Sequence, residues 1–410
     1  MKHTFVINLS HMNVGGIENY VAQILQLGLD ENCRIIWLCD KACEVSPVYE
    51  KLMNDPRVER CHCDNHLVNW FRHEPLEFAR DEKVVIFSFG FFDHARALQL
   101  KSERPRVRII PLLLIPHFLG SDLYPEKAFQ GLARTWVRKL AAGLYGQWLD
   151  DGILYAFSMR HLDTIEELYG ITVENKQARI VPRLLDGIPF SEEEVIHRYQ
   201  ASEFTICSAG RLEFPHKGFV LGLLREFAQL KPSYPFLRLK IIGAGDGEAV
   251  LRQELSQMPA DITGSVEICP PVSLAELNEE FKKAKLNISV AGCASAGAKV
   301  GLLTLPARHY CYECEVYGFF PESRSCTTES KPGEPVGPYI ERVIHMSQEE
   351  YVDLSRKAYD TMNDKPADRG HFLGLDEAGK KSGLSKAQKW KLYAVLMAQR
   401  LLYKLKGLPE

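Results

Sequence analysis

The feature that most constrains the fold is an alternation of short apolar runs with helical patterns, which occurs in two successive blocks of the chain. The first block opens with an apolar run at residues 5–9, a turn at 11–16 and a helical pattern whose apolar residues share one face. Its further apolar runs, rich in branched and aromatic residues, lie at 34–38, 84–89, 107–114 and 151–158. Strands covered on both faces have this composition, so a parallel sheet is expected here.

The second block repeats this order more regularly. Strands are predicted at 204–208, 237–242, 266–269, 286–290 and 302–305, and helices at 218–230, 251–258 and 274–284. Pro182, Gly187 and Pro189 interrupt the pattern between the blocks, where we expect the linker. The alternation predicts an α/β fold of two doubly wound, Rossmann-like domains that face each other across a cleft, with ligands at the carboxyl ends of the strands. The expected domains are 1–185 and 186–375, followed by a C-terminal segment, 376–410.

The composition excludes several classes of protein. Of the 410 residues, 46% are hydrophobic, which suits a sizeable core, and 50 Lys and Arg against 53 Asp and Glu give a net charge of −3. A globally basic field is therefore excluded, and nucleic acid is not an expected partner. The most apolar stretches, 84–92 and 109–120, are too short to span a membrane, and the N-terminus predicts a strand rather than a signal peptide. Eleven unevenly scattered cysteines fit a reducing compartment, so a cytoplasmic protein is expected.

Two loops at predicted strand ends carry residues suited to phosphate. Gly15 and Gly16 stand between a strand and a helix, where free backbone N–H groups favour phosphate, although a tight turn explains them equally well. Arg211 and Lys217 bracket a loop that follows the strand at 204–208. Two cations at that position suit a diphosphate and can neutralise charge on a leaving group, whereas solvated surface charges are the alternative.

Two further turns follow strands of the second block. Gly243 opens a glycine-containing turn in which Glu248 occupies the place of the third glycine of the dinucleotide fingerprint. An NAD site is therefore not favoured, and a turn near a nucleotide is expected. The segment Ala291–Lys299, which includes Ser295, begins a helix with small residues. That composition suits an anion site, close packing of the helix on the sheet, or both.

In the order of these segments, the chain resembles the group 1 (GT4-like) glycosyltransferases of the GT-B fold, of the type that builds bacterial surface polysaccharides. The segments that carry the resemblance are 15–18 (GGIE), 115–117 (IPH), Ser158 ahead of a helix that ends at 169–171, 210–211 with 217–219, 242–245 (IGAG) and 299–304 (KVGLLT). Together they span nearly the whole chain, and six segments in the family's order are more specific than any one of them.

The resemblance implies roles for individual residues. Arg211 and Lys217 would bind the donor diphosphate, Gly15 and Gly16 would lie against the donor or acceptor, and His117 would face the transferred sugar. The remaining implied contacts with the donor nucleotide are made by Gly243, Ser295 and Lys299. A half-buried structural histidine is the alternative for His117, and Asp122 is a candidate base if the reaction inverts configuration.

One departure from the family concerns two glutamates that are separated by seven residues, the second of which touches the nucleotide ribose. Counting back from Gly301, their places hold Ile288 and Ala296, whose side chains cannot accept a hydrogen bond. Either the donor is held differently or the chain has lost activity. Glu313 and Glu315 are the candidate substitutes.

No metal site is predicted. Cys311 and Cys314 have the spacing of a metal knuckle, and Cys61, His62 and Cys63 with His66 offer other candidate ligands. The two groups belong to different expected domains, and neither is accompanied by a second close pair of standard spacing. Buried structural cysteines are the favoured interpretation.

The C-terminal segment is basic and amphipathic. From residue 379 to 409 it carries eight Lys or Arg and no Asp or Glu, interleaved with Trp390, Leu401 and other large apolar residues. Such a helix suits an anionic membrane surface, and a helix packed back on the N-terminal domain is the alternative. Residues 136–148, between two tryptophans, are a second candidate surface.

The expected function is transfer of a sugar from a nucleotide-sugar donor to a lipopolysaccharide, capsule or other lipid-linked glycan, on the cytoplasmic side of the plasma membrane. By the resemblance, the reaction retains configuration. Arg211, Lys217 and helix N-termini can stabilise the leaving diphosphate, so neither a metal nor another cofactor is required. Two alternatives stay open: a non-catalytic GT-B subunit that binds glycan or an active partner transferase, and a sugar-nucleotide epimerase that acts on the donor alone.

Overall fold

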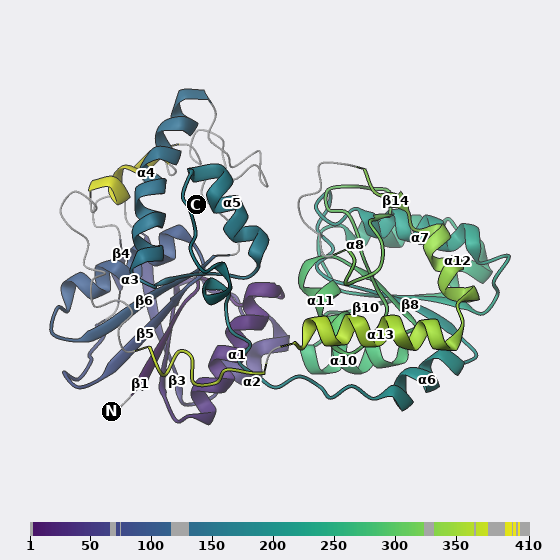
Figure 1. Ribbon diagram of the computed structural model, residues 1–410, viewed down its shortest axis with the longest axis horizontal. Coiled ribbons are helices and arrows are strands. Elements are labelled where there is room, and N and C mark those ends of the chain that lie inside the picture. The colour runs from purple at the N-terminus through teal and green to yellow at the C-terminus, as the bar shows by residue number, and fades with distance from the viewer. Residues whose placement is uncertain are drawn as a thin grey trace. The chain divides into compact units, whose positions relative to one another are not determined.

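The computed structural model describes residues 3–65, 71–73, 75–115, 131–323, 332–364, 366–375, 390–395, 397, 398 and 401. Contacts divide the chain into two compact units. The first comprises Met1–Asn13, Tyr20–Leu185 and the described residues from 367 onward, and the second comprises Val14–Asn19 and Asp186–Pro366. Each unit is built on its own sheet, with helices packed on it (Figure 1).

The first unit holds a seven-stranded sheet in the order β4-β3-β2-β1-β5-β6-β7. Its strands are β1 (His3–Asn8), β2 (Arg34–Asp40), β3 (Val58–Asn65), β4 (Phe71–His73), β5 (Lys83–Ser88), β6 (Arg108–Ile115) and β7 (Leu154–Ala156). Every neighbouring pair is parallel except β3 and β4. Strand β5 is buried along its whole length, and β1 is buried except at its first residue, as their apolar runs predict.

Helices of the first unit connect these strands. They are α1 (Gly16–Asp30), α2 (Pro47–Met53), α3 (Phe91–Glu103), α4 (Gly131–Asp150), α5 (Met159–Tyr169) and the short 3-10 helix η2 (Lys176–Arg179). Helix α3 packs on β1, β5 and β6, and α4 packs on α5 and β7. Ser158 caps α5 by accepting a hydrogen bond from the His161 backbone, and Gly170 ends the helix in the left-handed conformation.

The second unit holds a five-stranded parallel sheet in the order β10-β9-β8-β11-β12. Its strands are β8 (Phe204–Ala209), β9 (Leu237–Ile242), β10 (Val266–Cys269), β11 (Leu286–Ser289) and β12 (Thr304–Pro306), and a separate antiparallel pair is formed by β13 (Glu315–Val316) and β14 (Glu334–Pro335). The helices are α6 (Glu192–Gln200), α7 (Phe219–Leu230), α8 (Glu248–Ser256), α9 (Ala260–Thr263), α10 (Leu274–Lys283), α11 (Ala291–Lys299), α12 (Gly337–His345) and α13 (Gln348–Met362). Helix α7 packs on β9, α10 on β8, and α11 on β11 and β12.

The expected fold class, α/β with two doubly wound Rossmann-like units, is confirmed. Two expected assignments differ. Residues 14–19, which the sequence places in the first domain, are grouped with the second unit. Residues 367–375, which the sequence places in the second domain, belong to the first unit. Phe372 packs edge-on against Phe87, Asp368 donates its backbone N–H to the Arg183 carbonyl at 2.8 Å, and Arg369 pairs with Asp30 at 2.9 Å.

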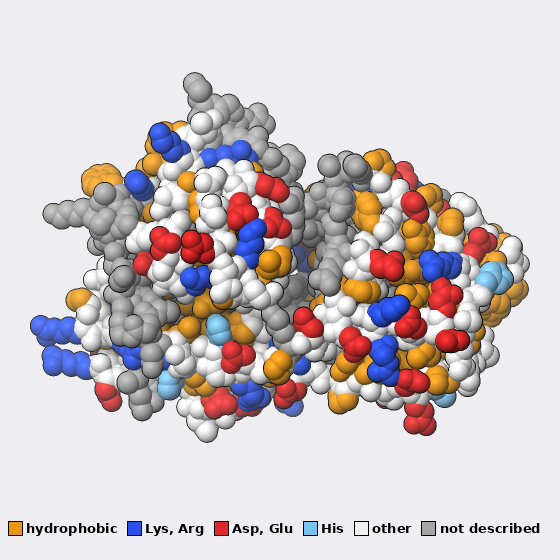
Figure 2. All heavy atoms as spheres, in the orientation of Figure 1, with side chains coloured by type: hydrophobic (Ala, Val, Ile, Leu, Met, Phe, Trp, Pro, Cys, Tyr) orange, Lys and Arg blue, Asp and Glu red, His pale blue; other side chains and the backbone are white. Residues whose placement is uncertain are grey.

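Two surface properties bear on partners. Among the described residues, no helix is both long and apolar enough to cross a membrane. On the face shown in Figure 2, acidic and basic side chains are interspersed in both units.

Candidate functional site

The strand order of the second unit marks one place where a ligand is expected. From β8 the chain moves outward in one direction to β9 and β10, and then returns to add β11 and β12 on the other side of β8. The loops that leave the carboxyl ends of β8 and β11 therefore separate at that point. In open α/β sheets, ligands bind in the crevice formed there.

Backbone contacts fix the loops that follow β8 and β9. Gly210 donates its N–H to the Ile242 carbonyl at 3.0 Å, and Leu212 donates to the Ala244 carbonyl at 2.9 Å. Gly243 lies so close to Gly210 that a Cβ at position 243 would be 1.9 Å from the Gly210 carbonyl oxygen. Gly243 is thus explained by the close approach of two backbones, and it lies at the same sheet edge as the loop of Arg211.

Arg211 and Lys217 both belong to the loop between β8 and α7. The Lys217 ammonium group folds over Gly210, 3.1 Å from the position that a Cβ there would take. Burial lowers the pKa of Lys217, and the neighbouring Arg211 charge lowers it further. A cation whose charge is disfavoured in this way gains more than an exposed one when an anion binds beside it.

Glu213 is the counter-ion of this loop. Its carboxylate lies 3.1 Å from the Arg211 guanidinium, and its hydrogen bond with His216 is the main cause that lowers its pKa. Arg211, Lys217 and Glu213 together carry a formal charge of +1 at neutral pH. An incoming diphosphate would compete with Glu213 for Arg211, because both are oxygen anions that suit a guanidinium.

A pair of histidines borders the same loop and was not singled out from the sequence. His216 Nε2 and His309 Nδ1 are 2.9 Å apart, and the His216 ring lies 4.9 Å from the Tyr310 ring. Burial lowers the pKa of His309 to about 3, with smaller contributions from His216 and Lys217. His309 is therefore neutral at physiological pH. His309 lies three residues after β12, at the carboxyl edge of the sheet. That position after a strand is the feature of the sequence from which His309 could have been predicted as a site residue.

Helix α11 begins at this edge and ends at the opposite one. The chain passes from β11 to α11 through Val290 alone, and Cys293, in the first turn, is close enough to Lys217 to influence its pKa. Ser295 is half-buried in the next turn. Lys299 occupies the last turn, roughly 12 Å along the helix axis from Ala291 at the start of α11. The structure therefore does not bring Lys299 to Arg211 and Lys217.

The places counted for the two family glutamates lie in the hydrophobic core. Ile288 is fully buried inside β11, and Ala296 is 8% exposed on the sheet-facing side of α11. A carboxylate at either position would be buried among apolar side chains. Because β11 and α11 are joined by one residue, there is no loop between them from which a side chain could reach a ligand.

The two candidate substitutes are placed differently. Glu315 is engaged within the protein, since its carboxylate pairs with Arg308 at 2.7 Å and accepts the Gly333 N–H at 2.9 Å. Glu313 is exposed, and its carboxylate accepts a hydrogen bond from the Cys311 thiol at 3.3 Å. Of the two, Glu313 is the exposed one, whereas Glu315 is half-buried.

The remaining expected site residues come from the first half of the sequence, but the structure groups Gly15 and Gly16 with the second unit. Gly15 precedes α1 and Gly16 is its first residue, and no heavy atom lies within 4 Å of the position that a Cβ on Gly16 would take. Packing therefore does not explain Gly16. His117 and Asp122 lie outside the described residues.

Comparisons with known proteins identify the fold. No protein-family model and no curated protein sequence matches the chain. Among solved structures, the chain is similar to HepE of Anabaena in complex with UDP-glucose, with 15% identity, 94% of this chain and 100% of that chain covered, and a TM-score of 0.54. It is also similar to a TarM mutant of S. aureus in complex with fondaparinux, α-GlcNAc-glycerol and UDP (8%, 96% and 100%, TM-score 0.54).

A glycosyltransferase from Rickettsia africae gives a third match, with 12% identity, 98% of this chain and 99% of that chain covered, and a TM-score of 0.53. Each match extends over both units and nearly the full length of the solved protein. The chain therefore has the two-domain α/β fold of the GT-B glycosyltransferases.

Proposed function

We propose that the chain is a glycosyltransferase that takes a sugar from a nucleoside-diphosphate donor and transfers it to a glycan acceptor. The observation that carries the proposal is the position of Arg211 and Lys217 at the switch point of the second sheet, beside the Gly210 backbone and the first turn of α11. Two of the similar solved structures contain UDP-glucose or UDP and share this fold, which supports a nucleotide-sugar donor.

The proposed chemistry follows from charge. Breaking the bond between a sugar and a diphosphate leaves negative charge on the departing phosphate, and preorganised cations stabilise that charge as it forms. Arg211 and Lys217 supply two such cations, and the N–H groups of the first turn of α11 supply further donors. We propose that transfer retains configuration and proceeds without a divalent cation. Transfer that is unchanged after treatment with EDTA would support the second point.

We further propose that the acceptor is a lipid-linked glycan, such as lipopolysaccharide or capsule, reached at the cytoplasmic membrane surface. Three apolar side chains of the C-terminal segment are exposed: Trp390 by 75%, Leu401 by 60% and Met397 by 46%. Trp136 on α4 is 50% exposed. Exposed tryptophans and basic residues together suit an anionic lipid interface.

The membrane part of the proposal is tested separately. Vesicles that contain phosphatidylglycerol should sediment with the protein, vesicles of phosphatidylcholine should not, and Trp390→Ser should weaken sedimentation. If wild type and Trp390→Ser sediment to the same extent with both kinds of vesicle, membrane contact through this segment is contradicted. That result would leave the donor site untested.

The transferase itself is tested with a panel of UDP-, GDP- and CMP-sugars, first by thermal shift and then by transfer to a glycan acceptor. A ligand that binds only the folded chain raises its stability by about 2.7 kcal/mol at a hundredfold excess over Kd. One nucleotide class should stabilise the protein and act as donor. Conversion of the donor sugar without any acceptor would instead support an epimerase.

A second candidate function is favoured by one observation. Ile288 and Ala296 lie in the core where the family carries glutamates, which suits a non-catalytic subunit that binds glycan or an active partner transferase. In that case the isolated chain should neither bind a nucleotide of the panel nor transfer sugar. Transfer should then appear only when a partner transferase is added.

A further inference from the structure

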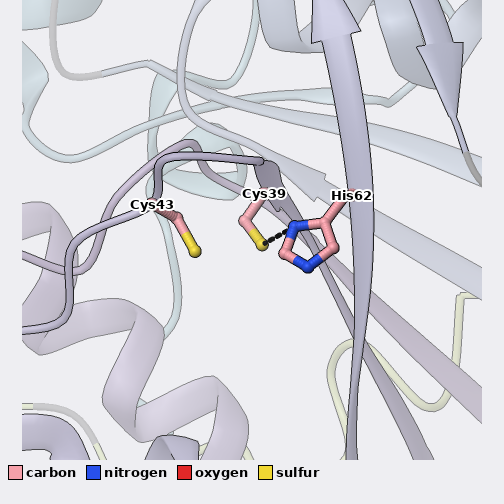
Figure 3. A group of neighbouring side chains, drawn as sticks. All are labelled: Cys39, Cys43 and His62. Atoms are coloured by element: carbon pink, nitrogen blue, oxygen red, sulfur yellow. Dashed lines mark hydrogen bonds between the residues drawn. The ribbon is translucent and has the colours of Figure 1, made fainter.

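A second cluster of functional side chains lies in the first unit, apart from the residues proposed for the donor. Cys39, Cys43 and His62 place their two sulfur atoms and one ring nitrogen within 4.8 Å of one another. The Cys39 Sγ lies 3.7 Å from His62 Nδ1, and Figure 3 shows the Cys43 side chain beside the other two. Cys39 is buried, whereas Cys43 and His62 are half-buried.

The fold explains how residues so far apart in the sequence meet. Cys39 and His62 are direct partners in the parallel pairing of β2 with β3, so their side chains project from the same face of the sheet. Cys43 lies in the turn after β2, where its N–H donates to the Asp40 carbonyl at 3.1 Å and brings its side chain back over the strand end. Regular pairing and a short turn thus assemble the three groups.

The same alternation separates His62 from its neighbours in the sequence. Cys61 and Cys63 flank it on β3, and both side chains are buried in the hydrophobic core of the first unit. Successive residues of a strand face opposite sides. Cys61 and Cys63, which the sequence offers only as candidate ligands beside His62, therefore do not share its face, and Cys39 and Cys43 are the thiols that lie near it.

We propose that Cys39, Cys43 and His62 bind one Zn²⁺ ion, with solvent at the fourth position. Two thiolates and one imidazole are ligands that zinc prefers, and bond lengths near 2.3 Å for sulfur and 2.0 Å for nitrogen place tetrahedral S and N ligands about 3.5 Å apart. The observed 3.7 Å between Cys39 Sγ and His62 Nδ1 fits that value without rearrangement of the strands.

The surroundings of the cluster suit an ion that replaces thiol protons. The guanidinium of Arg60 lies over the Trp37 ring, two paired positions before Cys39 and His62 and so on the same face of the sheet. Two thiolates balance the charge of Zn²⁺, so the bound site is neutral and compatible with a half-buried position.

Zinc at this place would connect the turn after β2 to both β2 and β3. The expected consequence is a more stable first unit, since binding to the folded chain alone shifts the unfolding equilibrium. The ion has no part in the proposed sugar transfer. Loss of zinc should therefore lower the melting temperature before it affects donor binding.

The test uses the full chain, purified with a phosphine reductant and freed of metal by a chelator. Titration with Co²⁺ should saturate at one equivalent and produce thiolate-to-cobalt charge-transfer absorption together with the visible bands of a tetrahedral ion. Zn²⁺ should displace the cobalt and raise the melting temperature. Cys43→Ser and His62→Gln should each weaken Co²⁺ binding by at least about tenfold.

Cys269→Ser is the matched control, because Cys269 is also half-buried but lies in the second unit. It should bind one equivalent with the wild-type spectrum. Cys43 lies in a turn, so Cys43→Ser should keep the fold even if His62→Gln does not, and circular dichroism checks this. The proposal is overturned if the folded wild type binds no Co²⁺, if it binds without charge-transfer absorption, or if Cys43→Ser binds like the wild type.

Discussion

At the scale of single residues, the site depends on two glycines for different reasons. Gly243 leaves no space for a Cβ because the Gly210 carbonyl lies 1.9 Å from that position, whereas the space next to Gly16 is open. Packing accounts for the first glycine. The second is available for a functional explanation, which is contact with the donor or acceptor.

Gly243→Ala is therefore expected to destabilise the protein by at least about 2 kcal/mol, because the added methyl group must push two backbones apart. Gly16→Ala should leave the free energy of unfolding unchanged or raise it by up to about 1 kcal/mol, since Gly16 is a helical residue. Urea unfolding of both variants measures the difference. Equal destabilisation would contradict the close approach at Gly243, and reduced transfer by a stable Gly16→Ala variant would place Gly16 at the site.

A buried carboxyl group in the first unit gives a prediction about pH. Burial raises the pKa of Asp93 to about 6, and the nearby Arg96, 3.9 Å away, only partly offsets that shift. Because the folded-state pKa exceeds the ordinary value of 3.8, the folded state binds the proton more tightly than the unfolded chain. The contribution of Asp93 to stability should therefore fall as the pH rises from about 4 to about 6, by on the order of 2 kcal/mol.

Asp93→Asn should reduce this loss of stability, which urea unfolding at a series of pH values would show. Asp261→Asn, which removes an exposed carboxylate of α9, is the control for the loss of one negative charge. If the pH dependence of stability between pH 4 and pH 6 is the same in the wild type and in Asp93→Asn, the assigned environment of Asp93 is contradicted.

At the scale of elements, three helices of the second unit, α6, α10 and α13, are each preceded by a serine whose side chain accepts a backbone hydrogen bond from the first turn. Ser273 and Glu276 form a complete capping box at the start of α10: the serine accepts the Glu276 N–H at 3.3 Å, and the glutamate accepts the Ser273 N–H at 2.8 Å. Each bond satisfies a backbone donor that has no partner within the helix.

Ser273→Ala should cost about 1 kcal/mol of stability, because the Glu276 N–H loses its acceptor. Thermal and urea unfolding measure the loss. Ser256→Ala, which removes a hydroxyl from the last turn of α8, should change stability much less. A cost for Ser256→Ala as large as that for Ser273→Ala would show that the capping box adds nothing.

Most strands of both sheets could be predicted because branched, aromatic and other apolar residues predominate in them, as at β5, β8 and β9. Strand β3 was missed, since its sequence VERCHCDN is largely polar and its apolar positions are cysteines. Strands β13 and β14 have two residues each, too few for any pattern.

The candidate site could be predicted only in part. Arg211 and Lys217 were recognised because they follow a predictable strand. The neighbouring His309 follows β12, nearly a hundred residues later in the sequence. Likewise, the Cys39–His62 contact depends on the register of β2 against β3, which is a property of the paired strands rather than of either sequence alone. Spacing in the sequence predicts site residues that lie close together in the chain. It does not predict residues that strand pairing brings together from distant parts of the chain.

At the scale of the whole molecule, the chain combines a topological switch point in the sheet of the second unit, next to Arg211 and Lys217, with a thiol–imidazole cluster in the first. The two groups belong to different sheets and different units. Donor binding and zinc binding should therefore be separable by mutation. Cys43→Ser should retain nucleotide affinity, and Lys217→Ala should retain the cobalt spectrum.

The most direct test of the central claim is calorimetric titration with the nucleoside diphosphate that stabilises the chain best. Arg211→Ala and Lys217→Ala should each weaken binding by about ten- to a hundredfold, since each removes a charge-assisted contact. Arg252→Ala, which removes an exposed arginine of α8, should bind like the wild type. Wild-type affinity in folded Arg211→Ala and Lys217→Ala variants would contradict the assignment of the donor site to the carboxyl edge of β8.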